Sequence, residues 1–162
     1  MPETAVSEKK FSPAIAVVAV VIVMAVVLRV YGAWKERRKI TAEITLKSKV
    51  FTVEVADTEK KREKGLGERD TLAADHGMYF PFGSAQYWIF WMKGMRFPID
   101  IVWIRDGKVV DIDPSVPLPK TEPLETYSPS EPADAVLELN AGVAAELELH
   151  PGDSAQIRAL AP

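Results

Sequence analysis

The sequence predicts a mainly β fold of the α+β type, namely a compact antiparallel barrel-like domain with two short helices, preceded by one N-terminal transmembrane helix. Three observations support this prediction. Apolar and polar residues alternate strictly in residues 40–47 and again in 51–55, which is typical of half-buried strands. Asp106 and Gly107 join two apolar runs and are a strong signal for a two-residue hairpin. Residues 14–28 contain no polar side chain.

The chain divides by composition into four segments: an N-terminal tail (1–10), a transmembrane anchor (11–34), a basic juxtamembrane segment (35–39) and a soluble β-rich domain (40–162). As a helix, residues 11–31 would extend for about 32 Å, close to the thickness of a hydrocarbon core. A cleaved signal peptide is the alternative, because Lys9 and Lys10 precede the apolar run. The charges that flank this run favour a cytoplasmic domain only slightly, so the side of the membrane stays open.

The two parts of the chain differ in charge. Residues 1–39 carry a net charge of +4 and residues 40–162 a net charge of −7. An acidic domain without a basic stripe argues against nucleic acid as a partner. The absence of cysteine excludes disulfides, thiolate zinc sites and thiol nucleophiles. With two histidines and no ligand spacing, we expect neither a bound metal nor a cofactor.

The first half of the domain is expected to contain a hairpin, a short helix and two strands. The hairpin joins residues 40–47 to 51–55, and Asp57 or Thr58 then caps a charged helix that Gly65 ends. Residues 77–82 follow as a strand that Pro81 places at an edge or a bend. Residues 86–92 are so continuously apolar that we expect a further strand that is buried on both faces.

The second half begins with a hairpin formed by residues 99–105 and 108–113. Residues 114–132 hold six of the twelve prolines, so we expect an extended covering loop without a ladder strand or a helix. An alternating strand (135–139), a short helix (142–149) and a last strand (155–158) complete the domain. Glu138 falls on the polar face of the alternating strand, where we expect an ordinary surface residue.

The candidate site lies in residues 87–105, which hold three of the four tryptophans. Lys93 and Asp100 stand there in apolar surroundings, where a charge is costly unless it is paired. We predict that both lie at the rim of a pocket floored by Trp91, Met92 and Trp103, with Lys93 available to an anionic ligand group. The alternatives are a structural ion pair, or an Asp100 carboxylate that caps backbone amides of the loop. The aromatic cluster itself is either core or pocket lining.

The remaining candidates for chemistry are the two histidines. His76 follows Asp75, which suggests a base with an orienting carboxylate. Neighbours in an extended segment point to opposite faces, so we favour a surface histidine that does not take part in a reaction. His150 precedes Pro151 in a turn and is expected to be structural. No nucleophile elbow, phosphate loop or dinucleotide fingerprint is present, so the catalytic residues are unknown.

Three stretches, GLGERDTLAADHGMYFPF, FWMKGMRFPIDIVWI and AVLELNAGVAAELELHPGD, resemble the family known as domain of unknown function number 192 over about residues 50–158. The resemblance implies a compact, mainly β domain with short helices, frequently preceded by an export signal or a membrane anchor, and no established activity. It favours an extracytoplasmic domain. The chain has Gly67 where the family usually has methionine, and Gly94 and Met95 where it usually has a small polar residue with threonine. A pocket lined by these positions would therefore differ in shape.

These observations together predict a membrane-anchored recognition module of unestablished activity. Its N-terminal helix would contact membrane lipid, and its domain would bind a small molecule, an envelope component or a protein partner. An enzyme that uses Lys93 and Asp100 beside an aromatic pocket is the second, less favoured hypothesis, and a structural scaffold of a membrane complex is the third. The sequence identifies neither the ligand nor the oligomeric state.

Overall fold

The computed structural model describes residues 13–37, 40–120 and 123–159, and the chain divides into two compact units, residues 1–38 and 39–162. The first unit contains the helix α1 (Pro13–Arg37). Among the helices of the described residues, none combines the length and the apolar character that a bilayer span requires. The anchor expected for residues 11–34 begins outside the described residues, and it stays a prediction.

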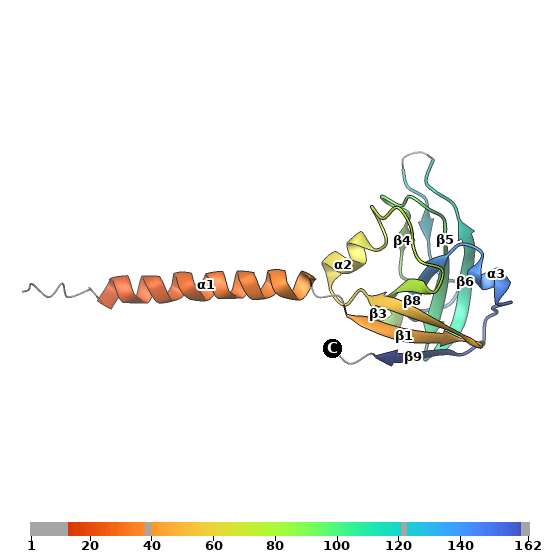
Figure 1. Cartoon of the computed structure of the whole chain (residues 1–162), viewed down its shortest axis with the longest axis horizontal. Helices are drawn as coiled ribbons and strands as arrows, with labels where there is room; N and C mark the ends of the chain where they lie inside the picture. Colours follow the sequence, from red (N-terminus) through yellow and green to blue (C-terminus); the bar gives the residue numbers. More distant parts are fainter. Residues whose placement is uncertain (1–12, 38–39, 121–122, 160–162) are drawn as a thin grey trace, which may run out of the picture. The chain divides into compact units, whose positions relative to one another are not determined.

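The second unit is mainly β with two short helices, as the sequence predicts. The two helices lie on opposite sides of the domain in Figure 1. Seven strands form one sheet in the order β6-β5-β8-β3-β2-β1-β9. Their bounds are β1 (Thr41–Leu46), β2 (Lys49–Val55), β3 (His76–Gln86), β5 (Ile99–Arg105), β6 (Lys108–Val116), β8 (Ala133–Asn140) and β9 (Ala155–Ala159). A second, two-stranded sheet pairs β4 (Phe90–Trp91) with β7 (Thr126–Tyr127), and the helices are α2 (Glu59–Lys64) and α3 (Val143–Glu146).

The large sheet curls into a half-barrel, and its two edge strands meet at one end. The N–H of Val109 donates to the carbonyl of Asp153 at 2.9 Å, and the N–H of Gly152 donates to the carbonyl of Val109 at 2.8 Å. The N–H of Ala155 adds a third bond, to the carbonyl of Gly107 at 2.8 Å. These bonds satisfy backbone groups that an open sheet edge would leave exposed.

The expectation of a purely antiparallel domain is wrong for one pair of strands. β2 and β3 run parallel, with Thr52 opposite His76 and Val55 opposite Tyr79, whereas the other neighbours are antiparallel. A parallel pair needs a crossover connection. The segment between the two strands provides it and carries α2.

Both predicted hairpins are confirmed, and so are the ends of α2. The β1–β2 hairpin places Leu46 opposite Lys49. The side chain of Thr58 accepts a hydrogen bond from the N–H of Lys61 at 3.3 Å, and Gly65 ends the helix with φ at 52°. Glycine adopts this left-handed backbone without a steric penalty.

Two predictions for the middle of the chain are wrong. Residues 86–92 do not form one buried strand, because β3 ends at Gln86 and only Phe90 and Trp91 pair again. The proline-rich segment does contain strand residues, since β6 continues through Pro114 and β7 lies within the segment. Pro114 is tolerated because β6 is an edge strand, where the missing N–H deprives no neighbour of a partner.

The central strands β5, β8 and β3 are covered on both faces of the sheet. One core cluster lies on the side of Leu137 and Leu139, and a second lies on the side of Val136 and Phe80. Every residue of β5 from Ile99 to Ile104 is buried, which explains the long apolar run in its sequence. The second cluster lies next to the candidate site.

Candidate functional site

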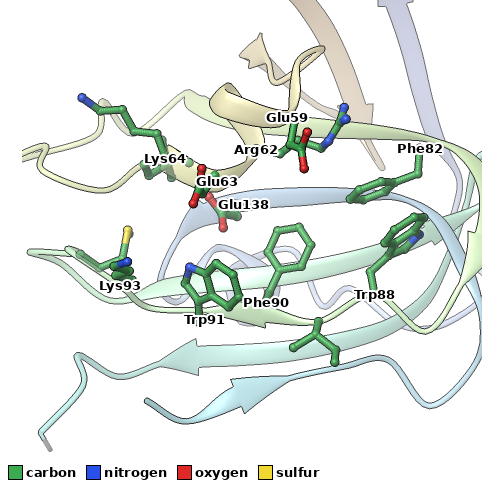
Figure 2. Close-up of a pocket in the computed structure, with 14 residues that line it drawn as sticks. Glu59, Arg62, Glu63, Lys64, Phe82, Trp88, Phe90, Trp91, Lys93 and Glu138 are labelled. Atoms are coloured by element: carbon green, nitrogen blue, oxygen red, sulfur yellow. The ribbon is translucent and has the colours of Figure 1, made fainter. Parts of the chain in front are cut away.

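The candidate site is a pocket of about 420 Å³ between α2 and four aromatic side chains. These four, Phe82, Trp88, Phe90 and Trp91, are called the aromatic row. Figure 2 shows the row along one side of the pocket, α2 along the other, and Glu138 between them. The complete lining consists of Glu59, Arg62, Glu63, Lys64, Gly65, Leu66, the aromatic row, Ile89, Lys93, Met95 and Glu138.

Ring contacts hold three members of the aromatic row in place, namely Phe82, Trp88 and Phe90. Phe82 and Trp88 stack with their centroids 3.9 Å apart and their planes 15° apart. The indole N–H of Trp88 donates to the carbonyl of Ala133 at 2.9 Å. Phe90 meets the rings of Phe80 and Trp103 edge to face, at 5.1 and 5.4 Å. Edge-to-face and stacked pairs add stability beyond the area they bury, so this wall is preorganised.

The segment after β3 alternates between the core and solvent. Trp88 and Phe90 are half-buried, whereas Tyr87, Ile89 and Trp91 are exposed, at 60%, 63% and 44%. The sequence does not show this alternation because all five residues are apolar or aromatic. Of the exposed members, Ile89 and Trp91 line the pocket, and exposed apolar patches often mark interaction sites.

Glu138 is the most unusual residue of the pocket. It lies on the central strand β8, in register with Met78 and Ile101, and only 5% of it is exposed. Its Oε2 atom has no hydrogen-bond partner among the described residues. Burial raises the pKa of its carboxyl to about 8, against the opposing effect of the positive charge on Arg69. At neutral pH this carboxyl is therefore mostly protonated.

The prediction of Glu138 as an ordinary surface residue is wrong. In β8 the residues Leu137 and Leu139 face one core cluster, and the residues that alternate with them face the second. A strand with apolar layers on both faces has no polar face, and alternation in its own sequence does not reveal this. The uninterrupted apolar run of β5, its neighbour, is the one signal in the sequence that points to burial on both sides.

Most of the basic groups around the pocket already have partners. The guanidinium of Arg62 lies 5.7 Å from the centroid of the Phe82 ring, and its Nη1 donates to the carbonyl of Ala56 at 3.4 Å. Lys64 pairs with Glu68 at 2.9 Å.

Arg69, which acts on Glu138 from the loop after α2, is bound elsewhere. Its two terminal nitrogens donate to the two carboxylate oxygens of Glu54 at 2.7 and 2.9 Å. This hydrogen bonding to Glu54 is the main cause that raises the pKa of Arg69, and Glu138 contributes a smaller effect. Arg69 therefore acts on Glu138 through its positive charge, and among the described residues no hydrogen bond joins the two side chains.

The structure separates Lys93 from Asp100, which the sequence places at a shared rim. Asp100 is fully buried, and its carboxylate accepts hydrogen bonds from the N–H groups of Ser115 (2.7 Å), Gly142 (3.1 Å) and Ala144 (2.7 Å). Among the described residues no ion pair joins it to Lys93. Asp100 therefore caps backbone amides, which is one of the alternatives weighed above, and Lys93 alone reaches the pocket.

The three residues expected as the pocket floor have three different places. Trp91 lines the pocket and is partly exposed. Met92 is buried and lines a different hollow, beneath the proline-rich segment. Trp103 is fully buried in the core, and its indole N–H donates to Asp113 at 2.7 Å. The tryptophan-rich segment is therefore partly core and partly pocket lining.

The histidine interpretation needs one correction. Nδ1 of His76 lies 2.7 Å from Oδ1 of Asp75, so these neighbours do meet. This hydrogen bond is the main cause that lowers the pKa of Asp75. Both side chains are exposed and neither lines the pocket, so the surface interpretation agrees with the geometry. Within residues 13–37, 40–120 and 123–159, no group of three potential ligands lies close enough to hold a metal ion.

Positions at which the chain departs from the family pattern lie together in space. A Cβ on Gly67 would come within 3.1 Å of the carbonyl oxygen of Lys93, and the N–H of Glu68 donates to the carbonyl of Gly94 at 2.8 Å. Lys93 and Met95 both line the pocket. A side chain at position 67 would therefore change the contact beside the pocket mouth.

Comparisons with known proteins identify relatives but no activity. The model of the family DUF192, described as "Uncharacterized ACR", matches residues 40–157. A crystal structure of a protein of unknown function from Novosphingobium aromaticivorans is 30% identical, with a TM-score of 0.64, over 73% of this chain and 84% of that one. A protein from Sinorhizobium meliloti described as a "putative transcription regulator" is 33% identical, also with a TM-score of 0.64, over 74% and 93% of the two chains. No curated protein matches the chain.

Proposed function

The chain belongs to the family DUF192, and on this premise we propose that its β-rich domain is a recognition module that binds a small molecule between α2 and the aromatic row. The observation that carries the proposal is the Glu138 carboxyl at the pocket, buried and with Oε2 unsatisfied among the described residues. A buried polar group without a partner costs roughly 1–3 kcal/mol. A ligand that supplies the missing hydrogen bond would recover part of this cost.

The shape of the site also favours binding over a scaffold. A small-molecule site is concave and mostly apolar, with a few polar groups that fix the orientation of the ligand. The pocket has this composition, since the aromatic row faces the charged side chains of α2. A flat apolar patch would have favoured the scaffold hypothesis instead.

An enzyme is the second candidate, and Glu138 is the residue that favours it. A carboxyl whose pKa lies near the working pH is suited to general acid–base catalysis, and burial raises the pKa of Glu138 to about 8. The pair considered from the sequence loses its support, because Asp100 is occupied by three backbone amides. Turnover of any compound in a broad substrate panel, with loss of turnover in Glu138→Gln, would favour the enzyme.

The acidic domain gives no support to a direct role in binding DNA, although one relative is described as a regulator. Residues 40–162 carry a net charge of −7, and phosphate backbones bind to basic surfaces. We therefore keep small-molecule recognition as the proposal.

The test is a fragment screen by NMR on the full chain, with the indole N–H signals of the tryptophans as reporters. Binding in the pocket should shift the signals of Trp88 and Trp91, which line it, and leave Trp103, which is buried in the core, less affected. Native mass spectrometry of gently purified protein should detect a co-purified ligand. A screen with cationic, neutral and anionic fragments in which none shifts Trp88 or Trp91 would contradict the proposal.

We also propose that residues 11–34 anchor the domain to a membrane. The proposal is supported by the run 14–28, which has no polar side chain, and by Tyr31 and Trp34, residue types that favour the membrane interface. The full chain should stay with the membrane fraction after carbonate extraction, and a chain that begins at residue 40 should not. Intact mass measurement is the control, because a mature protein without these residues would show a cleaved signal peptide and contradict the anchor.

A further inference from the structure

The Glu138 carboxyl group requires a hydrogen-bond partner that the described residues do not provide. Its register neighbours Met78 and Ile101 are apolar. A Cβ built on Gly65 would lie 3.8 Å from Oε2, so this oxygen lies close to the backbone at the end of α2. Oε2 itself is buried, but Glu138 lines the pocket, so a molecule bound there lies beside the carboxyl group. Such a molecule can supply the hydrogen bond that the carboxyl group lacks.

The aromatic row favours a cation in this pocket. The faces of aromatic rings carry partial negative charge and attract ammonium and guanidinium groups. The protein already uses one ring in this way, since the guanidinium of Arg62 lies 5.7 Å from the centroid of Phe82. Phe90 and Trp91 line the same pocket as Glu138 (Figure 2).

The balance of charge around the pocket points in the same direction. Arg62 and Lys64 are engaged with Ala56 and Glu68, as described above. In the described part of the chain, by contrast, no ion pair is formed by Glu59 or Glu63, which both line the pocket. The lining groups that lack an ion pair or hydrogen bond are thus mainly acidic, with Lys93 as the basic exception.

From these three observations we infer that the pocket takes a small molecule with a cationic nitrogen, of the amine or guanidine type, on an apolar or aromatic body. The nitrogen donates a hydrogen bond to Glu138, and the apolar body lies against the aromatic row. This inference rests on the proposed recognition function and adds the chemical class of the ligand.

Binding of a cation at this position requires a change in protonation. Burial raises the pKa of Glu138 to about 8, so the free pocket holds a neutral carboxyl at pH 7. A cation beside the group favours the carboxylate, and the proton passes to the solvent. The charged groups that line the pocket with Glu138 or act on it are Glu59, Arg62, Glu63 and Lys64 of α2, Lys93, and Arg69 of the following loop.

A neutral ligand would behave differently. A hydroxyl or carbonyl group would accept a hydrogen bond from the protonated carboxyl, and no proton would leave. Release of a proton therefore separates the two classes of ligand.

The experiment uses the full chain and three probes of similar size: phenethylamine, 2-phenylethanol and 3-phenylpropanoate. Calorimetry at pH 7 in two buffers with different ionisation enthalpies gives both the affinity and the number of protons released. We expect phenethylamine to bind at least about tenfold more tightly than the other two probes, a difference of about 1.4 kcal/mol. We also expect close to one proton to be released for each amine bound.

Glu138→Gln is the test variant, and Glu146→Gln is its matched control. Glu138→Gln should remove the preference for the amine and the release of the proton. Glu146→Gln removes an acidic group on α3, outside the pocket, and should retain the preference and the proton release. If Glu138→Gln fails to fold, proton release by the native chain decides the question alone.

The outcomes are distinguishable. Binding of the alcohol or the carboxylate as tightly as the amine, or amine binding without proton release, would overturn the cation inference and leave the recognition function intact. If none of the three probes binds, the cation inference is wrong. If the fragment screen also finds nothing at Trp88 or Trp91, the recognition function is wrong as well.

Discussion

The carboxylate of Asp100 accepts a hydrogen bond from the backbone N–H of Ala144 at 2.7 Å, which joins the middle of the sheet to the start of α3. The same carboxylate accepts from Ser115 at 2.7 Å and from Gly142 at 3.1 Å. One buried side chain thus satisfies three backbone donors from two segments that are distant in the sequence. The role of Asp100 is therefore structural.

Asp100→Asn should destabilise the domain by about 2–4 kcal/mol. The variant amide retains one acceptor oxygen, but its NH₂ group replaces the other and faces a backbone donor. Urea unfolding would measure the loss in the free energy of unfolding. The matched control is Asp70→Asn, since the Asp70 side chain is 83% exposed and pairs with the exposed Arg96. A loss for Asp100→Asn no larger than that for Asp70→Asn would contradict the capping role.

Glu138 should make the stability of the domain decrease as the pH rises. Its pKa is 4.5 in the unfolded chain and about 8 in the folded one, so between these values the folded state holds a proton that the unfolded state has lost. The free energy of unfolding should therefore decrease by about 1.4 kcal/mol for each pH unit in this range. Below pH 4.5 both states are protonated and the contribution is constant.

Glu138→Gln removes this titration, so the variant should lack the slope and be more stable than the native chain at pH 8. Denaturation curves at four pH values between 5 and 8 would measure the difference between the two proteins. Glu146→Gln, which changes a 64% exposed carboxylate, should retain the slope of the native chain. Parallel profiles for the native chain and Glu138→Gln would show that the group titrates normally.

Gly77 should be intolerant of any side chain. A Cβ at this position would lie 2.7 Å from the carbonyl oxygen of Glu138 and 2.8 Å from a methyl carbon of Leu139. Gly77→Ala would therefore force β3 away from β8 and should cost about 1–3 kcal/mol. Gly83→Ala lies in the same strand with no atom within 4 Å of the new Cβ and is the control. Equal melting temperatures for the two variants would contradict the close packing of β3 on β8.

Trp103→Phe should raise the pKa of Asp113. Burial already raises this pKa, and the hydrogen bond from the indole N–H of Trp103 opposes the increase. Phenylalanine retains most of the buried ring but has no donor, so the charged form of Asp113 loses its stabilisation. An NMR titration of the Asp113 carboxyl carbon would measure the shift.

The control for this titration is Phe90→Leu. Phe90 contacts the Trp103 ring edge to face at 5.4 Å but makes no hydrogen bond to Asp113. It should disturb the packing without raising the pKa of Asp113 by a similar amount. An unchanged pKa in Trp103→Phe would mean that the indole hydrogen bond does not affect the titration of Asp113.

Several strands and caps follow from the sequence because their causes are local. The β1–β2 hairpin depends on alternation within a few residues, and the turn at Asp106 and Gly107 depends on two positions with positive φ, at 51° and 71°. The ends of α2 depend on Thr58 and Gly65, which act on their own helix. The family resemblance over residues 50–158 agrees with the family model match at residues 40–157.

The parallel pairing of β2 with β3 and the place of the tryptophans do not follow from local patterns. Trp88 and Trp91 line the pocket while Trp103 is buried, although all three lie in one apolar segment. Which of them reaches solvent depends on where β3 ends and β5 begins, and on which segments cover the sheet. These contacts join residues far apart in the sequence.

The sequence by itself determined a mainly β domain, its principal hairpins and its family, because alternation and turn chemistry act between near neighbours. Only the tertiary structure decided that Asp100 is a buried cap and that Glu138 is a buried acidic group of the pocket. Asp100 and Glu138 lie in similar apolar strands but have different surroundings. Asp100 accepts hydrogen bonds from three backbone N–H groups, whereas Glu138 has apolar neighbours and lines a pocket. The free energy of a buried charge depends on such partners, and the folded chain brings them from distant segments.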